Sequence, residues 1–318
     1  MKLQLNTPDT TLTWLADLVE RKKQSGAARL IGISTTTVYR LLADTYEGDR
    51  EGMIAKIEQA RQTEISRIEL VGKVQYIETH LASEVHHLCE QTRIFKTLNR
   101  VIGNSQIGKT TALEEYTRTY TNTYMLTLHP GTTMSALIRM LASKLGVKAH
   151  IARDLALAEL GAAINHNSLI IVDECHQVAY DKHGIKTMEF LRALHDMSKC
   201  GVLLCGTYLL DTWMRKGVAA DTLCQLINRG TTTYLESYPR RSDLDALAEG
   251  YNLPPINDEA FEFALEYITR EGLGPFCREV ERAIYLATNA GKVPTWALNT
   301  ALIERAMDER TAAFGDRK

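Results

Sequence analysis

The sequence lacks the features of a membrane-spanning, exported or disulfide-stabilised protein. No run of eighteen apolar residues occurs, so we expect no membrane span. The N-terminal stretch MKLQLNTPDTTL has no apolar core of a signal peptide. The six cysteines form no C-x-x-C pair, and Cys175, Cys205 and Cys224 lie in or beside apolar runs. We therefore expect reduced cysteines in a cytoplasmic protein that does not contact a membrane.

The chain also has little net charge. Its 37 Lys and Arg residues nearly balance its 39 Asp and Glu residues, which gives a formal charge of −2. This balance argues against a protein coated in positive charge, but a local basic face or a ring of subunits can still attract nucleic acid. With 318 residues, 45% hydrophobic and 24% charged, the composition is that of a globular protein with one large domain or two to three modest ones.

The stretch GNSQIGKTT has the spacing G-x-x-x-x-G-K-T of a phosphate-binding loop. The apolar run Leu98 to Ile102 before it suits a buried strand, and Thr110 to Thr119 after it suits a helix. Backbone N–H groups and a helix N-terminus would then point at one anion. The predicted nucleotide-binding residues are Gly103, Asn104, Ser105, Gln106, Ile107, Gly108, Lys109, Thr110 and Thr111. The alternative is a glycine-rich turn with an exposed lysine.

Within this loop, Lys109 would reach the terminal phosphates and the Thr110 hydroxyl would bind Mg²⁺. The segment LIIVDE, about sixty residues later, ends a buried strand in two acids. Asp173 would hold the Mg²⁺ ion, and Glu174 would polarise the attacking water. Two adjacent acids at the end of a buried strand would be costly without a nearby cation. The two motifs together predict binding of ATP and Mg²⁺.

A third polar group is expected on a neighbouring strand, on the side of the γ-phosphate. Thr207, at the end of VLLCGT, is the candidate, and a simple strand-ending threonine is the alternative.

From residue 96 the pattern alternates strands (123–128, 168–174, 201–207) with helices (133–147, 155–165), which indicates an α/β layered domain over 96–238 with a parallel sheet. Residues 239–318 read as a small helical lobe.

The first fifty residues predict short helices. In residues 24–42, Ala28, Gly32, Val38 and Leu41 have the spacing of a helix-turn-helix. We expect a head over 1–52 and a charged helical connector over 53–95. Ser34 would cap the second helix, and the outward residues predicted to contact DNA are Ser34, Thr35, Thr36, Tyr39 and Arg40. A helical protein–protein module is the alternative.

This order of parts resembles the AAA+ ATPases: a helix-turn-helix head, a P-loop, a DE pair and a helical lid. More narrowly it resembles the transposon ATPase subunits related to transposition protein B of phage Mu. Besides the two motifs, this resemblance includes TYEGD (45–49), YIET (76–79) and GPFCR (274–278), and it spans nearly the whole chain.

The resemblance implies two further site residues. Arg229 in LINRG looks like the arginine that reaches the phosphate of a neighbouring subunit, and Arg278 like the lid's sensor arginine. A surface ion pair is the alternative for either. The family usually has asparagine where Thr207 stands, so the sensing of nucleotide state would be weaker here. DECH (173–176) also departs from the usual alanine after the glutamate.

The resemblance further implies an ATPase that forms a homo-oligomer, a helical filament or ring, on double-stranded DNA and recruits or activates a DDE-type transposase. Two alternatives remain. A secretion-type AAA+ ATPase shares the core but commonly carries a membrane anchor, which this sequence lacks. A DNA-binding regulator would use ATP only as a switch, whereas the intact DE pair favours turnover.

Overall fold

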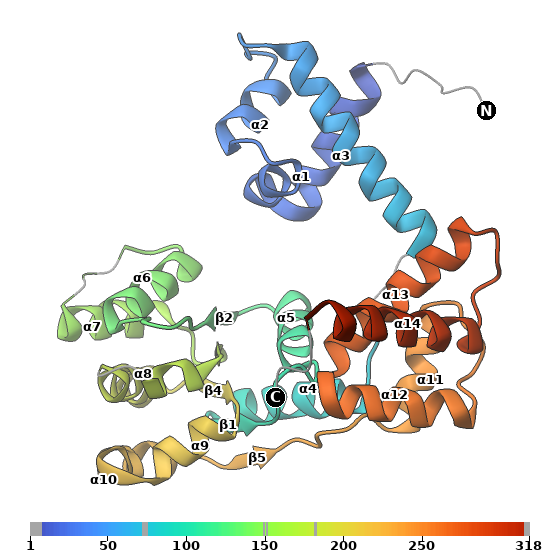
Figure 1. Ribbon diagram of the computed structural model, residues 1–318. Coiled ribbons are helices and arrows are strands. Elements are labelled where there is room, and N and C mark those ends of the chain that lie inside the picture. The colour runs from blue at the N-terminus through green and yellow to red at the C-terminus, as the bar shows by residue number, and fades with distance from the viewer. Residues whose placement is uncertain (1–7, 72–75, 149, 151, 181–182, 315–318) are drawn as a thin grey trace. The chain divides into compact units, whose positions relative to one another are not determined.

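The computed structural model describes residues 8–71, 76–148, 150, 152–180 and 183–314 (Figure 1). The chain divides into two compact units, Met1–Val74 and Gln75–Lys318. In the described part of the chain, no helix is both long and apolar enough to span a bilayer.

The described residues of the first unit form three helices, α1 (Pro8–Ile31), α2 (Thr35–Leu42) and α3 (Arg50–Val71). Lys23 has a left-handed backbone (φ 58°) that kinks α1. The Ser34 hydroxyl accepts a hydrogen bond from the Thr37 N–H at 2.9 Å, so the predicted N-cap is present. The core is a cluster of apolar side chains from all three helices: Leu15, Leu18, Ala27, Ala28, Ile31, Val38, Leu41 and Ile57.

The predicted turn lies between α1 and α2. Gly32 has φ 73°, which favours glycine, while Ala28, Val38 and Leu41 are buried. The five side chains predicted to contact DNA are all exposed, and Tyr39 is 63% exposed. Their contact with DNA stays a prediction, because exposure alone does not identify a partner.

The expected connector over 53–95 does not form a segment of its own in the described residues. The chain divides between residues 74 and 75, and Ile57 of α3 belongs to the core of the first unit. Helix α4 (His80–Phe95) instead packs against the sheet of the second unit through Val85 and Cys89. Burial of apolar side chains on both sides of residue 74 accounts for this division.

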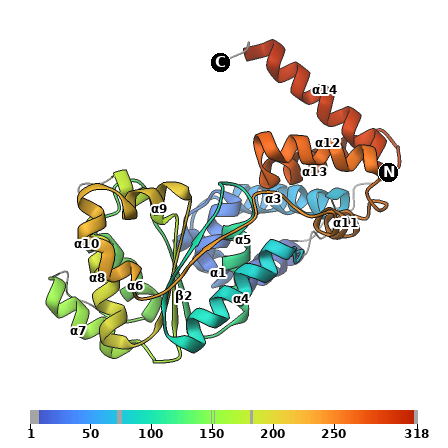
Figure 2. The same cartoon turned by 90° about the horizontal axis from the view of Figure 1, so that it is seen from below.

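A parallel five-stranded sheet forms the centre of the second unit, with strand order β2-β3-β4-β1-β5. Side chains alternate between its two faces. Leu204 faces α6 (Met134–Leu145), α7 (Arg153–Ala163), α8 (Gly184–Ser198) and α10 (Gly217–Ile227). Leu203 faces α4 and α5 (Lys109–Thr119), so helices cover both faces (Figure 2). The strands are β1 (Leu98–Ile102), β2 (Thr123–Thr127), β3 (Leu169–Asp173), β4 (Gly201–Gly206) and β5 (Thr232–Tyr234).

Helices connect the strands, and the helical lobe follows β5. The helices of the α/β part after α4 are α5 (Lys109–Thr119), α6 (Met134–Leu145), α7 (Arg153–Ala163), the short 3-10 helix η1 (Cys175–Tyr180), α8 (Gly184–Ser198), α9 (Tyr208–Arg215) and α10 (Gly217–Ile227). The lobe contains α11 (Arg241–Gly250), α12 (Asp258–Glu271), α13 (Leu273–Asn289) and α14 (Trp296–Phe314). The Trp296 indole N–H donates to the Pro254 carbonyl at 2.7 Å and closes this lobe.

Candidate nucleotide site

The glycine loop leaves the carboxyl end of β1 and enters α5. Gln106 and Gly108 have left-handed backbones, with φ 64° and 98°. A Cβ at Gly103 would lie 2.8 Å from the Ile107 side chain, so the loop closes on itself without room for a larger residue. A Cβ at Gly108 would meet nothing within 4 Å, which leaves open space at the N-terminus of α5. A concave loop followed by a helix N-terminus binds phosphate.

Lys109 is folded back over this loop. Its side chain is buried, and Nζ donates to the carbonyls of Gly103, at 3.1 Å, and Asn104. No carboxylate pairs with Lys109 among the described residues. Its charge is therefore available to an anion held by the loop.

Thr110 and Asp173 come together at the carboxyl edge of the sheet. The Thr110 hydroxyl donates to Asp173 Oδ2 at 2.6 Å, and the Glu174 N–H donates to Oδ1 at 2.8 Å. Asp173 is fully buried. A hydroxyl and a buried carboxylate in contact are hard oxygen ligands, and this donor set fits Mg²⁺. The pairing joins residues 63 positions apart, at the two motifs that the sequence singles out.

Glu174 stands in the turn between β3 and η1. Its backbone is left-handed (φ 57°), which is uncommon for a residue with a long side chain. The carboxylate is 38% exposed, and Oε2 lies 3.3 Å from Nε2 of His176. The base predicted from the sequence thus has a partly exposed carboxylate and a nearby imidazole.

Thr207 follows β4, the strand between those that carry the loop and the acids. The register pairs Ile102 with Gly206, so Thr207 lies beside the start of the loop at the same sheet edge. It occupies the N-cap position of α9, but its side chain makes no capping hydrogen bond. The hydroxyl is therefore not used by the helix.

The helical lobe contacts the glycine loop directly. The Gly274 N–H at the start of α13 donates to the Gln106 carbonyl at 3.2 Å. Gly272 has φ 97°, and a Cβ there would lie 2.7 Å from the Gln106 Cβ. Arg278 lies one turn further along α13 and is exposed. The structure brings the helix of Arg278 to the loop and shows no hydrogen bond from the guanidinium to a described residue.

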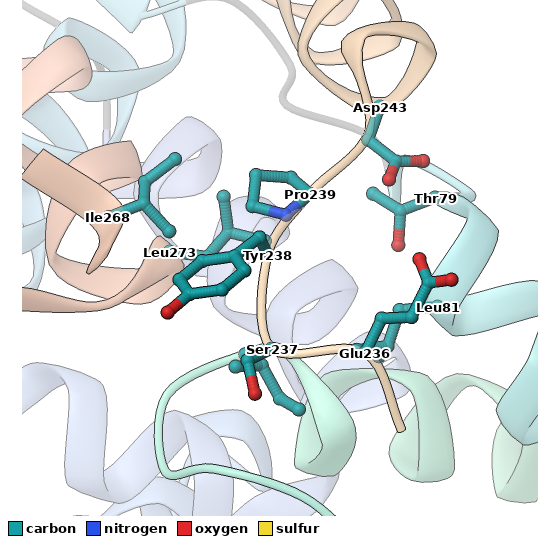
Figure 3. A pocket seen from close by; sticks show the side chains of 10 residues that line it. Thr79, Leu81, Glu236, Ser237, Tyr238, Pro239, Asp243, Ile268 and Leu273 are labelled. Atoms are coloured by element: carbon teal, nitrogen blue, oxygen red, sulfur yellow. The ribbon is translucent and has the colours of Figure 1, made fainter. Parts of the chain in front are cut away.

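A pocket beside the loop involves segments that the sequence motifs do not indicate. It is lined by Thr79, Leu81, Ile107, Glu236, Ser237, Tyr238, Pro239, Asp243, Ile268 and Leu273. Figure 3 shows the segment 236–239 between Thr79 and Leu81 on one side and Ile268 and Leu273 on the other. The Asn104 amide of the loop donates to the Ser237 hydroxyl at 3.0 Å. The pocket is narrow, with about 10 Å³ of open volume, and its largely apolar lining adjoins the phosphate loop.

Arg229 lies at the amino ends of the strands, opposite the carboxyl ends that carry the glycine loop. The Leu98 N–H donates to its carbonyl at 3.2 Å, which places Arg229 at the amino end of β1. Five residues at about 3.3 Å each put it about 16 Å from the glycine loop of its own chain. Its guanidinium holds Asp196 of α8 through Nε at 2.7 Å and Nη2 at 3.0 Å. The Arg229 guanidinium lowers the pKa of the Asp196 carboxyl.

The turn that carries Arg229 is fixed by a buried cation that the sequence motifs do not indicate. Arg100 of β1 is 3% exposed and donates to the Thr232 hydroxyl and to the carbonyls of Ile227 and Gly230. Burial lowers the pKa of Arg100 to about 10. No motif surrounds it. Its charged position within a buried strand is the one signal that could have marked it.

The chain is similar to known proteins over the part that carries the glycine loop and the two acids. Residues 96–214 match the AAA domain family. The chain is 24% identical over 229 residues to the ATP-dependent target DNA activator B of Escherichia phage Mu, covering 70% of each chain. It is 25% identical over 256 residues to the Mu-like prophage FluMu DNA transposition protein B of Haemophilus influenzae, covering 79% of this chain and 87% of the relative.

The Aeropyrum pernix ORC1 protein, solved in complex with DNA, has a similar fold. The TM-score is 0.50 at 14% identity, over 77% of this chain and 70% of that chain. At this identity the likeness shows the fold alone. The parallel sheet, the glycine loop and the match of residues 96–214 to the AAA domain family identify an AAA-type P-loop core, followed by a helical lobe, in a chain that resembles transposition protein B of phage Mu.

Proposed function

We propose that this protein is a DNA transposition ATPase that binds ATP and Mg²⁺, assembles as a homo-oligomer on double-stranded target DNA, and recruits or activates a DDE-type transposase. The observation that carries the proposal is the 2.6 Å contact between Thr110 and Asp173 in a chain similar to ATP-dependent target DNA activators.

The nucleotide would span the glycine loop and the adjoining pocket. The loop N–H groups and Lys109 would hold the phosphates, and the adenine would lie toward Tyr238 and Leu273, where the narrow pocket would have to widen to admit it. Thr110 and Asp173 would hold Mg²⁺, which when bound supplies positive charge to the phosphate oxygens. Lys109 reaches these phosphates once it releases the loop carbonyls.

Hydrolysis would depend on Glu174 and on arginine from two sources. The partly exposed Glu174 carboxylate would accept a proton from the attacking water. Arg278, on the helix that contacts the loop, would sense the nucleotide from the same chain. Arg229 would act on the nucleotide of a neighbouring subunit, because it lies at the sheet edge opposite its own loop.

DNA contact is assigned to the exposed face of α2 in the first unit. Ser34, Thr35 and Thr36 offer hydroxyls, and Tyr39 and Arg40 offer a ring and a positive charge. Groups of this kind bind phosphates and base edges. The similarity to proteins named for target DNA supports DNA as the partner.

The test compares DNA binding and transposase stimulation by the wild-type chain and Lys109→Ala, with Lys292→Ala as an exposed-lysine control. We expect ATP-dependent assemblies on DNA by electron microscopy, and stimulated strand transfer by a partner transposase, for wild type and the control only. Absence of DNA binding in every nucleotide state would favour the secretion-type ATPase. ATP-switched DNA binding without any stimulation would favour the regulator.

A further inference from the structure

Hydrogen bonds fix the backbone of Glu174 in the turn after β3. Its N–H donates to Asp173 Oδ1, and its carbonyl accepts from the Gln177 N–H at 2.9 Å. The Cys175 thiol, fully buried, donates to the Val172 carbonyl at 3.0 Å. The left-handed backbone at Glu174 costs of order 1 kcal/mol and persists because these contacts determine it.

His176 lies in η1, directly after this turn, and one edge of its ring faces Glu174. Its side chain is 14% exposed, and Nε2 lies 3.3 Å from Glu174 Oε2 and 3.2 Å from the Gln177 amide nitrogen. The other ring nitrogen, Nδ1, is buried with no hydrogen-bond partner in the described part of the chain. The polar contacts of this imidazole are therefore confined to the edge that faces Glu174.

An unpartnered buried ring nitrogen destabilises the fold, so the orientation of His176 is not explained by the packing of η1 alone. A neutral imidazole with its proton on Nε2 can donate to Glu174 Oε2 when the Gln177 amide turns its oxygen rather than its nitrogen toward Nε2, because the amide nitrogen is itself a donor. That bond would restrict the rotamers of a partly exposed glutamate and leave Oε1, which accepts no hydrogen bond from a described residue, to face a water molecule. A base oriented by a third group is the general arrangement of activated sites.

We propose that His176 is a positioning residue for Glu174: it holds the carboxylate of the proton-accepting glutamate in the orientation that hydrolysis needs. The inference rests on the proposed function, in which Glu174 is the base. DECH, with histidine two residues after the glutamate, is the sequence that makes this contact possible.

The test separates turnover from binding. His176→Ala should lower kcat for ATP about tenfold and leave KM within about twofold, because the imidazole acts through Glu174 and does not contact ATP. His176→Gln should recover most of the loss, since its amide nitrogen reaches the place of Nε2, whereas the shorter His176→Asn should not. The exposed His87→Ala is the matched control, and thermal unfolding monitors the fold.

A double-mutant cycle completes the test. In single-turnover reactions, Glu174→Gln with His176→Ala should be no slower than Glu174→Gln alone. Unchanged or raised kcat in His176→Ala, or an equal further loss in the Glu174→Gln background, would overturn the inference. If His176→Ala does not fold, the difference between His176→Gln and His176→Asn decides. Wild-type turnover by Glu174→Gln would instead refute the proposed base itself.

Discussion

Lys109 is a buried cation whose bonds are to the carbonyls of its own loop. Lys109→Ala removes the charge nearest to the terminal phosphates. We expect ATP affinity to fall at least about tenfold, the size of one charge-assisted contact. Fluorescent-ATP titration measures it, with Lys292→Ala as the control. Affinity within twofold of wild type would reject the loop assignment.

Arg100 is the second buried cation, and its role is structural. Arg100→Met keeps much of the side-chain volume but leaves the Ile227 and Gly230 carbonyls without their donor. We expect the free energy of unfolding to fall by about 1–3 kcal/mol. Urea unfolding measures this change, and Arg118→Met, at an exposed surface ion pair, is the control. An unchanged midpoint would show that water replaces the guanidinium.

Among the elements, α2 carries the predicted DNA face. Arg40→Ala removes one exposed positive charge from it. We expect duplex DNA affinity to fall several-fold and the slope of log affinity against log salt to drop by about one. Arg118→Ala is the matched surface control. If both variants bind DNA alike, the first unit is a protein-interaction module.

Contact between the lid and the loop depends on the absence of a side chain at Gly272, and the nearby Gly274 provides a matched control. A Cβ at Gly272 would clash with Gln106 at a left-handed backbone, whereas a Cβ at Gly274 has its nearest contact at 3.7 Å, with Arg278. Gly272→Ala should therefore weaken ATP binding several-fold and cost about 1–3 kcal/mol of stability, and Gly274→Ala should do neither. Titration and urea unfolding of the pair test this; equal effects of both would contradict it.

Local pattern predicted the elements that carry the motifs. The boundaries of β1 are those expected from its apolar run, and LIIVDE ends at the predicted strand edge. The strand β5 was not predicted, because it has three partly exposed residues and is recognisable only by its pairing with β1. Such a short edge strand has no periodicity of its own.

The same limit applies to the site. Thr110 and Asp173 could be placed together because each belongs to a motif. Arg100 and the pocket at Tyr238 could not, since their contacts join residues more than 100 positions apart with no pattern to mark them. Val38 and Leu41 could be predicted as core residues of the first unit from their spacing. That the core also includes Ile57 of α3 could be seen only from the packing in the structure.

At the scale of the whole molecule, Arg229 tests assembly. Arg229→Ala should bind ATP normally and hydrolyse it more slowly by several orders of magnitude. Mixing it with Lys109→Ala should restore part of the activity, because a Lys109→Ala subunit still donates Arg229 to a neighbour that holds ATP. No recovery in mixtures that co-assemble would mean that Arg229 acts within its own chain, or only through its ion pair with Asp196.

In the proposed homo-oligomer, each subunit would be directional, because the glycine loop and Arg229 lie at opposite ends of the strands of one parallel sheet. A contact that joins two different faces is heterologous, and repeated it gives a closed ring or an open helix. In an open helix, one end exposes a nucleotide that lacks its arginine and the other exposes an arginine that lacks its nucleotide. Hydrolysis would then proceed within the filament while the first end keeps its ATP, so the two ends would lose subunits at different rates.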